Sequence, residues 1–283
     1  MTTELHRFDV VAAVVFAFVA LCAAMLSGCA AQLTADGISS RALALLPADV
    51  ILLGERHDAP DHQRIHREVI EALAQRGALA AVALEMADQG RSSAGLAPDV
   101  EPAQVRSALL WENNAWPWAD YGPAVMAAVR AGVPVIGANL PRAQMRAAMN
   151  NADLDARLPA AALTAQQEAI RAGHCGLLPE GQILPMTRIQ VARDVAMAQT
   201  VQAAMVAGKT VVLLAGGGHV DRNLGVPQHL PATLQAKSVL LQTQRAEAGA
   251  DRADNFAEVW TTPRVPDKDY CAGLRAKLPR APE

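Results

Sequence analysis

Short apolar runs rich in β-branched residues alternate with longer amphipathic stretches along most of this chain. We expect strands at residues 50–53, 80–84, 133–137, 210–215 and 238–241, with a further edge strand at 256–261. We expect helices at residues 63–75, 104–113, 123–131, 142–149 and 188–206. Because strands that alternate with helices build parallel sheets, this order predicts an α/β fold with a mostly parallel central sheet flanked by helices.

One stretch breaks this alternation. Residues 150–185 are rich in Ala, Pro and Gly, and we interpret them as a helical insertion over one edge of the sheet. The α/β domain is expected to span residues 49–262. An N-terminal tether at 29–48 precedes it, and a loosely held C-terminal tail at 263–283 follows it.

The N-terminus has the pattern of a bacterial lipoprotein leader. Residues 10–26 form an uncharged apolar run that leads directly into Leu26-Ser27-Gly28-Cys29, which is the pattern of a lipobox. We expect residues 1–28 to be a signal peptide and Cys29 to carry a lipid, which places the protein at the outer membrane or periplasmic face. The alternative is a permanent transmembrane helix, but the small residues and the cysteine that end the run favour a lipoprotein.

Composition and cysteine usage narrow the class of protein. The chain is 52% hydrophobic with a formal net charge of −3, so it can bury a large core but offers no strong positive field for nucleic acid. Of its four cysteines, Cys22 lies in the leader and Cys29 in the lipobox. In an oxidising periplasm the remaining two, Cys175 and Cys271, are expected to form a disulfide. Free thiols or metal ligands are the alternatives, although neither residue lies in a CxxC pattern.

Polar side chains follow four of the expected strands. Glu55 and His57 come after the first strand, Glu85 ends the second, Asn139 ends the third, and His219 follows a glycine triplet after the fourth. The carboxyl ends of parallel strands meet at one edge of a sheet, where ligands bind. Two carboxylates and two imidazoles are sufficient to hold a divalent metal ion and leave a position for water or substrate. The alternative is that each residue only caps or orients a loop.

Two further groups stand out nearby. Asp58, His62 and His66 repeat at four-residue spacing, but the flanking pattern is not HExxH, so we interpret His66 as part of a solvated helix face and leave a contribution from His62 open. Four aromatic residues crowd into the segment WENNAWPWADY: Trp111, Trp116, Trp118 and Tyr121. They form either a flat apolar wall for a planar ligand or a staple that packs a loop over the core.

An ordered set of short motifs resembles one known family. ILLGERHDAPDHQ, ALEM, GANLPR, HCGLLP, MTRIQVARDVAMA and LLAGGGHVDRNLGVPQHL follow one another from about Asp49 to Leu230. Together they resemble the ChaN-like haem-binding uptake lipoproteins of the Tiki superfamily. The resemblance implies a Tiki-type α/β fold, a bacterial lipoprotein and a part in haem or iron acquisition. In related Tiki proteins, motifs that correspond here to Gly54, Glu55 and His57 and to Gly216 and His219 are associated with metal-dependent hydrolysis.

Two functions therefore remain open. The first is a membrane-anchored haem-binding lipoprotein in which Tyr121, His57 or His219 ligates the iron and Trp116 and Trp118 line the porphyrin; a ligand from His174 is also open. Its partners would be haem and, through Cys29, the lipid bilayer, and a homodimer is left open. The second is a metal-dependent hydrolase in which Glu55, His57, Glu85 and His219 hold or flank a divalent metal ion that activates water. Tyr270 is expected to pack against the disulfide.

Overall fold

All six strands in the described part of the chain belong to one parallel sheet. The computed structural model describes residues 34–244, 253–266 and 268–275. The strand order is β3-β2-β4-β1-β5-β6, and each neighbouring pair is parallel. The strands are β1 (Val50–Glu55), β2 (Leu79–Asp88), β3 (Val135–Asn139), β4 (Thr210–Gly216), β5 (Ala236–Thr243) and β6 (Glu258–Thr262). The predicted α/β class is confirmed, and β6 lies at an edge of the sheet.

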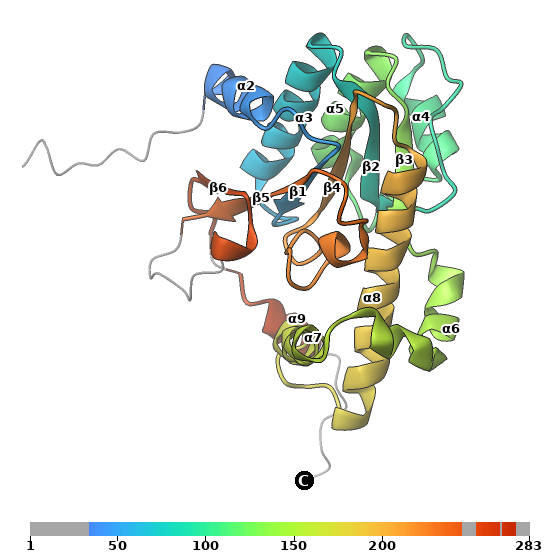
Figure 1. The fold of residues 1–283 in the computed structure, drawn as a ribbon, viewed down its shortest axis with the longest axis vertical. Helices are drawn as coiled ribbons and strands as arrows, with labels where there is room; N and C mark the ends of the chain where they lie inside the picture. Colours follow the sequence, from blue (N-terminus) through green and yellow to red (C-terminus); the bar gives the residue numbers. More distant parts are fainter. Residues whose placement is uncertain (1–33, 245–252, 267, 276–283) are drawn as a thin grey trace, which may run out of the picture. The chain divides into compact units, whose positions relative to one another are not determined.

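Helices cover both faces of this sheet, which explains why its central strands are apolar throughout. Every residue of β1 and of β4 is buried, so neither strand shows the alternation of a half-exposed strand. On one face, Ile51, Leu53 and Leu214 pack with residues of α2 (Ala35–Ala44), α3 (Pro60–Gln75) and α5 (Trp118–Arg130). On the other face, Leu52 and Leu213 pack with α8 (Glu180–Ala203), whose C-terminal end lies next to β3 in Figure 1.

The segment expected as a tether contains a packed helix. Helix α2 lies within residues 29–48, and its Ile38 and Ala42 are fully buried against the core. Thr34 caps the helix, because its hydroxyl accepts a hydrogen bond from Gly37 N at 3.2 Å. Between β2 and α5, α4 (Pro102–Leu109) buries Val105 and Leu109 in the same core. The folded unit therefore begins before residue 49.

The region of the expected insertion is helical, but it is continuous with α8. Helix α8 begins at Glu180 and runs through Pro185, so it starts earlier than the predicted residue 188. Helix α7 (Ala160–Gly173) contacts α8, and α6 (Met145–Asn150) does the same. Short 3₁₀ segments lie at Arg142–Gln144, Ala152–Arg157, Val226–His229 and Ala253–Asn255. Figure 1 shows α7 beside the N-terminal half of α8, which extends past the end of the sheet.

A disulfide links the C-terminal segment to this helical region. Cys271 lies in the short helix α9 (Tyr270–Arg275) and is bonded to Cys175, which follows α7. The predicted Cys175–Cys271 pair is confirmed. No helix among the described residues is long and apolar enough to cross a membrane. Cys29 and the expected signal peptide at residues 1–28 lie outside the described residues.

Candidate functional site

The four side chains predicted from the strand ends lie together. His57 Nδ1 is 2.6 Å from Glu55 Oε1, and His57 Nε2 is 3.9 Å from Glu85 Oε2. His219 Nε2 is 3.4 Å from Glu85 Oε1. The sheet sets this arrangement, because Glu55 of β1 pairs in register with Gly216 of β4, whose backbone N–H donates to Glu85 Oε2 at 2.7 Å. Two imidazoles and two carboxylates thus form one cluster at the carboxyl end of the sheet.

Glu55 lies at the buried side of this cluster and is held by three donors. Its Oε1 accepts hydrogen bonds from His57 and from the Tyr121 hydroxyl at 2.7 Å, and its Oε2 accepts one from Gln63 Nε2 at 2.9 Å. Burial disfavours the ionised carboxylate, but the hydrogen bond from His57 and its charge outweigh burial and lower the pKa of Glu55. The position of Glu55 is therefore fixed by α3 and α5 as well as by its own strand.

His219 is the buried imidazole of the cluster. Its Nδ1 lies 2.5 Å from Asp194 Oδ1 on α8, and Gln190 Nε2 lies 3.2 Å from the same ring. Burial alone would lower the pKa of His219, but the charges of Glu85 and Asp194 outweigh it and raise this pKa to about 10. His219 is therefore a cation held between two carboxylates. Asp194 and Gln190 were not predicted from the sequence. The signal that could have revealed them is the presence of a carboxylate, Asp194, within the helix expected at residues 188–206.

His57 is the exposed imidazole of the cluster. Its side chain is 40% exposed, whereas His219 is 5% exposed as a residue. Burial of part of the ring would lower the pKa of His57, but the hydrogen bond to Glu55 and the charge of Glu85 outweigh it and raise this pKa. The Trp116 ring contacts His57 edge-on, with centroids 4.9 Å apart. His57 is thus the member of the cluster that a ligand can reach.

The aromatic segment divides between core and site. Trp111 and Tyr121 are buried, and the Trp111 indole N–H donates to the Trp116 carbonyl at 2.7 Å. Of the two alternatives for the aromatic segment, Trp111 and Tyr121 therefore fit the second, in which aromatic side chains pack a loop over the core. Trp116 is half-buried and touches His57, while Trp118 is half-buried against Trp111, with ring centroids 5.1 Å apart. Of the tryptophans, Trp116 is the one in contact with the cluster.

The interpretation of His66 as part of a solvated face is wrong. Both His62 and His66 are fully buried, because α3 turns this face toward the sheet. His62 accepts a hydrogen bond from Arg56 N at 2.9 Å and its Nε2 lies 3.0 Å from the Thr262 hydroxyl, so it joins the first loop to β6. Burial lowers the pKa of His62 to about 4. His66 Nδ1 lies 3.6 Å from Glu55 Oε2, and neither of its ring nitrogens has a hydrogen-bond partner among the described residues.

The metal-ion interpretation of the cluster has no support. Within residues 34–244, 253–266 and 268–275, no group of three or more His, Cys, Asp or Glu side chains is arranged to hold a metal ion. The carboxylates already accept hydrogen bonds: Glu55 from His57, Tyr121 and Gln63, and Glu85 from Gly216 N.

Asn139, the polar residue predicted at the end of β3, is not among the partners of this cluster. Its side-chain oxygen is buried and has no hydrogen-bond partner among the described residues.

Comparison with known proteins places the chain in a family. A family model for haem-binding uptake proteins of the ChaN type, in the Tiki superfamily, matches residues 42–230. The chain belongs to this family. The matched residues include every member of the Glu/His cluster together with Asp194 and Tyr121, whereas α9 and its disulfide partner Cys271 lie beyond them.

One solved structure agrees with this membership. The structure of cofacial haem binding to ChaN of Campylobacter jejuni is 26% identical, has a TM-score of 0.59, and aligns over 74% of this chain and 87% of that one. The type III effector HopBA1 is 16% identical, with a TM-score of 0.45 over 82% of this chain and 92% of that one. That score is too low to add to the assignment. No curated protein matches the chain.

Proposed function

We propose that this chain binds haem through His57 and that it does so as a lipid-anchored protein in haem or iron uptake. The observation that carries the proposal is the position of His57, an exposed imidazole beside an aromatic ring in a protein of the haem-binding uptake family. Imidazole is a common axial ligand of haem iron, and an aromatic neighbour supplies apolar surface for the porphyrin.

The surroundings of His57 suit an iron ligand. Glu55 holds the ring through Nδ1, which leaves Nε2 as the nitrogen that can face iron. A carboxylate on the far nitrogen orients such a histidine and increases its basicity. Gly216 contributes by having no side chain, because a Cβ at that position would lie 3.0 Å from His57 Nε2. The glycine thus keeps the space beside this nitrogen clear.

The other predicted ligands are less accessible. Tyr121 is 2% exposed and its hydroxyl donates to Glu55, and burial together with that carboxylate raises the pKa of the phenol. His219 is enclosed between Glu85 and Asp194. His174 lies after α7, where its Nδ1 contacts the Ile170 carbonyl oxygen at 2.9 Å. Each of these groups is held by a direct contact of 2.5 to 2.9 Å, whereas the closest contact of His57 Nε2, to Glu85 Oε2, is 3.9 Å long and the His57 side chain is 40% exposed.

The membrane anchor is proposed from the sequence. The lipobox at Leu26-Ser27-Gly28-Cys29 supports lipidation of Cys29, and Ala30 after it is compatible with sorting to the outer membrane. Together with family membership, these residues support a protein that receives or stores haem at the periplasmic face of the outer membrane.

Titration with haemin tests the haem site. The protein lacking residues 1–28 is expected to shift the Soret band at micromolar haemin, and His57→Ala is expected to abolish the ligand-specific part of that shift. Tyr121→Phe and His219→Gln serve as matched variants that should retain it. A Soret spectrum that is the same for wild type and His57→Ala but lost in Tyr121→Phe would overturn the assignment of the ligand, and no shift at all would overturn haem binding. Sizing of the haemin-loaded protein measures whether a homodimer forms.

A further inference from the structure

Tyr270 connects the two residues that flank His57. Its hydroxyl accepts a hydrogen bond from Arg56 Nη2 at 2.9 Å and donates one to Asp58. Arg56 Nε also lies 2.7 Å from Asp58 Oδ1, so the three side chains form a closed set of contacts. Arg56 and Asp58 are the residues immediately before and after His57. Tyr270 was expected to pack against the disulfide, and it also contacts the loop that carries the proposed haem ligand.

This loop has an inner side that α3 holds and an outer side that Tyr270 holds. On the inner side, Arg56 N donates to Nδ1 of the buried His62 at 2.9 Å. His57 and Asp58 are exposed residues on the outer side. There, among the described residues, the side chains of Arg56 and Asp58 have each other and Tyr270 as their partners. The outer side of the loop therefore depends on a residue from the C-terminal segment.

Helix α9, which begins at Tyr270, does not attach itself to the protein by burying side chains. It has six residues, and none of residues 268–273 and 275 is buried. A helix of this length is marginal by itself, because few hydrogen bonds offset the cost of its nucleation. The covalent bond from Cys271 to Cys175 is therefore the main attachment of α9, which lies beside α7 (Figure 1). Tyr270 directly precedes Cys271, so this bond also fixes Tyr270 near the loop.

The other end of the disulfide lies in a well-ordered turn. Cys175 N donates to the Ala172 carbonyl at 3.0 Å, and Gly176 N donates to the Arg171 carbonyl at 2.9 Å. Cys175 and Gly176 both have left-handed backbone conformations, with φ of 60° and 66°, which is the way many helices end. Helix α7 packs on α8, and α8 packs on the sheet through β3. The disulfide thus joins α9 to the framework that carries the Glu/His cluster.

We propose that Tyr270 is a positioning residue for the His57 loop and that the Cys175–Cys271 disulfide keeps it in place. The inference rests on the proposed function, because this loop presents the proposed haem ligand. Tyr270 acts through the loop and not as an iron ligand, since its hydroxyl is engaged by Arg56 and Asp58. A loop that is already ordered before binding gives higher affinity than one that must be ordered by its ligand. Full affinity for haem therefore depends on Cys271, which lies outside the residues that match the family.

Titration of the protein lacking residues 1–28 with haemin measures this contribution. Cys175→Ala/Cys271→Ala and Tyr270→Phe are each expected to bind haemin about tenfold more weakly than the wild type, a loss of about 1.4 kcal/mol. The Soret maximum of the bound form should not change, because His57 remains the ligand. The cysteines are replaced rather than chemically reduced, because free thiolates are themselves haem ligands.

A triple variant tests whether the disulfide acts through Tyr270. If it does, Cys175→Ala/Cys271→Ala/Tyr270→Phe should bind haemin about tenfold more weakly than the wild type, and not about a hundredfold, because the two changes remove the same contact.

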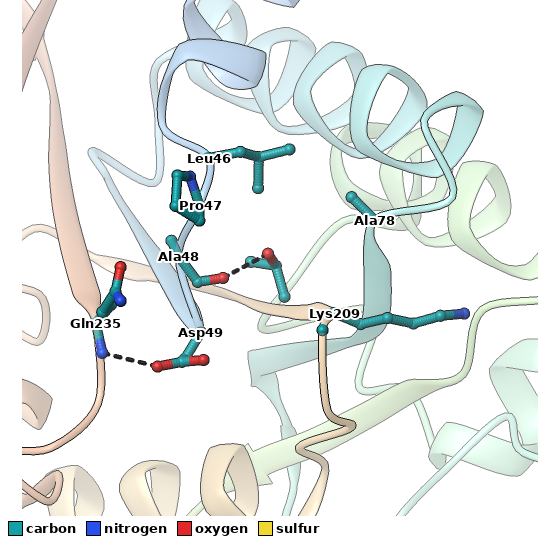
Figure 2. Close-up of a pocket in the computed structure, with 9 residues that line it drawn as sticks. Leu46, Pro47, Ala48, Asp49, Ala78, Lys209 and Gln235 are labelled. Carbon is teal, nitrogen blue, oxygen red and sulfur yellow. Dashed lines mark hydrogen bonds between the residues drawn. The ribbon is translucent and has the colours of Figure 1, made fainter.

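A matched control removes a similar contact at the other end of β1. Asp49 Oδ2 accepts a hydrogen bond from Gln235 N at 2.9 Å, and both residues line a hollow at the starts of β1 and β5 (Figure 2). Like Tyr270, Asp49 joins two segments that are far apart in the sequence, but it precedes β1, whereas His57 follows it. Asp49→Ala is therefore expected to keep the haemin affinity of the wild type.

Amide hydrogen exchange of the haem-free protein tests the positioning role without a ligand. Arg56 N donates to His62, and Ala59 N donates to the Arg56 carbonyl at 3.1 Å, so both amides report opening of the loop. Residues 54–60 are expected to exchange faster in Tyr270→Phe and in Cys175→Ala/Cys271→Ala than in the wild type. Residues 216–226, in the loop after β4, should exchange at the wild-type rate in both variants.

The outcomes separate this inference from the proposed function. Exchange over residues 54–60 that equals the wild type in both variants would overturn the positioning role, whether or not haem binds. Wild-type haemin affinity in both variants would overturn it as well and leave haem binding by His57 intact. A hundredfold loss in the triple variant would overturn the link between the disulfide and Tyr270, and a changed Soret maximum in Tyr270→Phe would make Tyr270 a ligand instead. The absence of any Soret shift in the wild type would overturn the proposed function, and the exchange experiment would still decide whether Tyr270 fixes the loop.

Discussion

The Nδ1 atom of His219 lies 2.5 Å from Oδ1 of Asp194, and both residues are buried. This contact joins the loop after β4 to α8. Glu85 adds a second carboxylate at 3.4 Å from the other ring nitrogen. The pair therefore stabilises the native state only while His219 carries its second proton.

The stability of the protein is expected to fall at alkaline pH because of this group. Folded His219 keeps its proton up to about pH 10, whereas the unfolded chain loses it near the ordinary value of 6.5. Between these values the native state binds more protons, so its stabilisation is complete below pH 6.5 and is lost as pH rises through about 10. Denaturant unfolding of wild type and His219→Gln at several pH values measures this. The difference between them should shrink as pH rises.

A control variant separates this effect from general alkaline unfolding. His174→Gln alters a histidine that contacts a backbone carbonyl instead of two carboxylates, and the loss of stability in His219→Gln should be measured against this variant as well as against the wild type. A difference between wild type and His219→Gln that stays constant from pH 6 to about 10 would contradict the charged state assigned to His219.

Removal of the Tyr121 hydroxyl is expected to destabilise the fold without changing the haem ligand. Tyr121 donates to a buried carboxylate, and a hydrogen bond to a charged group contributes about 1.5–3 kcal/mol. Tyr121→Phe should therefore lower the free energy of unfolding in urea by that order and leave the Soret maximum of the haemin complex in place. Tyr270→Phe, at an exposed position, should change unfolding by less than about 0.5 kcal/mol.

Gly225 is expected to be indispensable to the position of His219. A Cβ at residue 225 would collide with the backbone oxygen of His219, which also accepts a hydrogen bond from Val226 N at 2.7 Å. Gly225→Ala should cost about 1–3 kcal/mol or more, because backbone atoms cannot move aside as side chains do. Gly218→Ala, in the same loop but with open space around its Cβ, should be nearly neutral. Equal unfolding midpoints for the two variants would refute this account.

Lipidation is expected to depend on the thiol of Cys29, the residue that follows the leader. Replacing the thiol in Cys29→Ser should prevent acylation. The variant is then expected in the soluble fraction after cell lysis, whereas the wild type is expected in the membrane fraction. The measurement is the distribution of the full chain between soluble and membrane fractions, with Cys22→Ser as the matched control. Membrane recovery of Cys29→Ser equal to that of the wild type would instead favour a transmembrane leader.

Much of the fold was readable from the sequence because the sheet is parallel and buried. A short apolar run such as 210–215 that lies next to an amphipathic stretch is typical of a buried strand in a parallel sheet. Helix α2 was missed because only Ile38 and Ala42 of its residues are fully buried, which leaves a weak periodic pattern. The early start of α8 was missed because Pro185 suggested a break, although α8 runs through it.

The candidate site was predictable only in part. Glu55, His57, Glu85 and His219 could be grouped because topology brings strand ends to one edge. Asp194 and Gln63 reach the same place from helices, and no strand-end rule applies to them. Tyr121 was a candidate haem ligand, but α5 places its hydroxyl against Glu55. Which imidazole remains accessible depends on side-chain packing, so it could not be read from residue order.

The register of Glu55 opposite Gly216 also determines when the Glu/His cluster can form. Strands β1 and β4 are neighbours in the sheet, yet β2 and β3 come between them along the chain. A partly folded polypeptide therefore lacks the contact of Gly216 N with Glu85 until β4 has been inserted between β1 and β2. The Glu/His cluster can take its final geometry only after the last of its strands has joined the sheet.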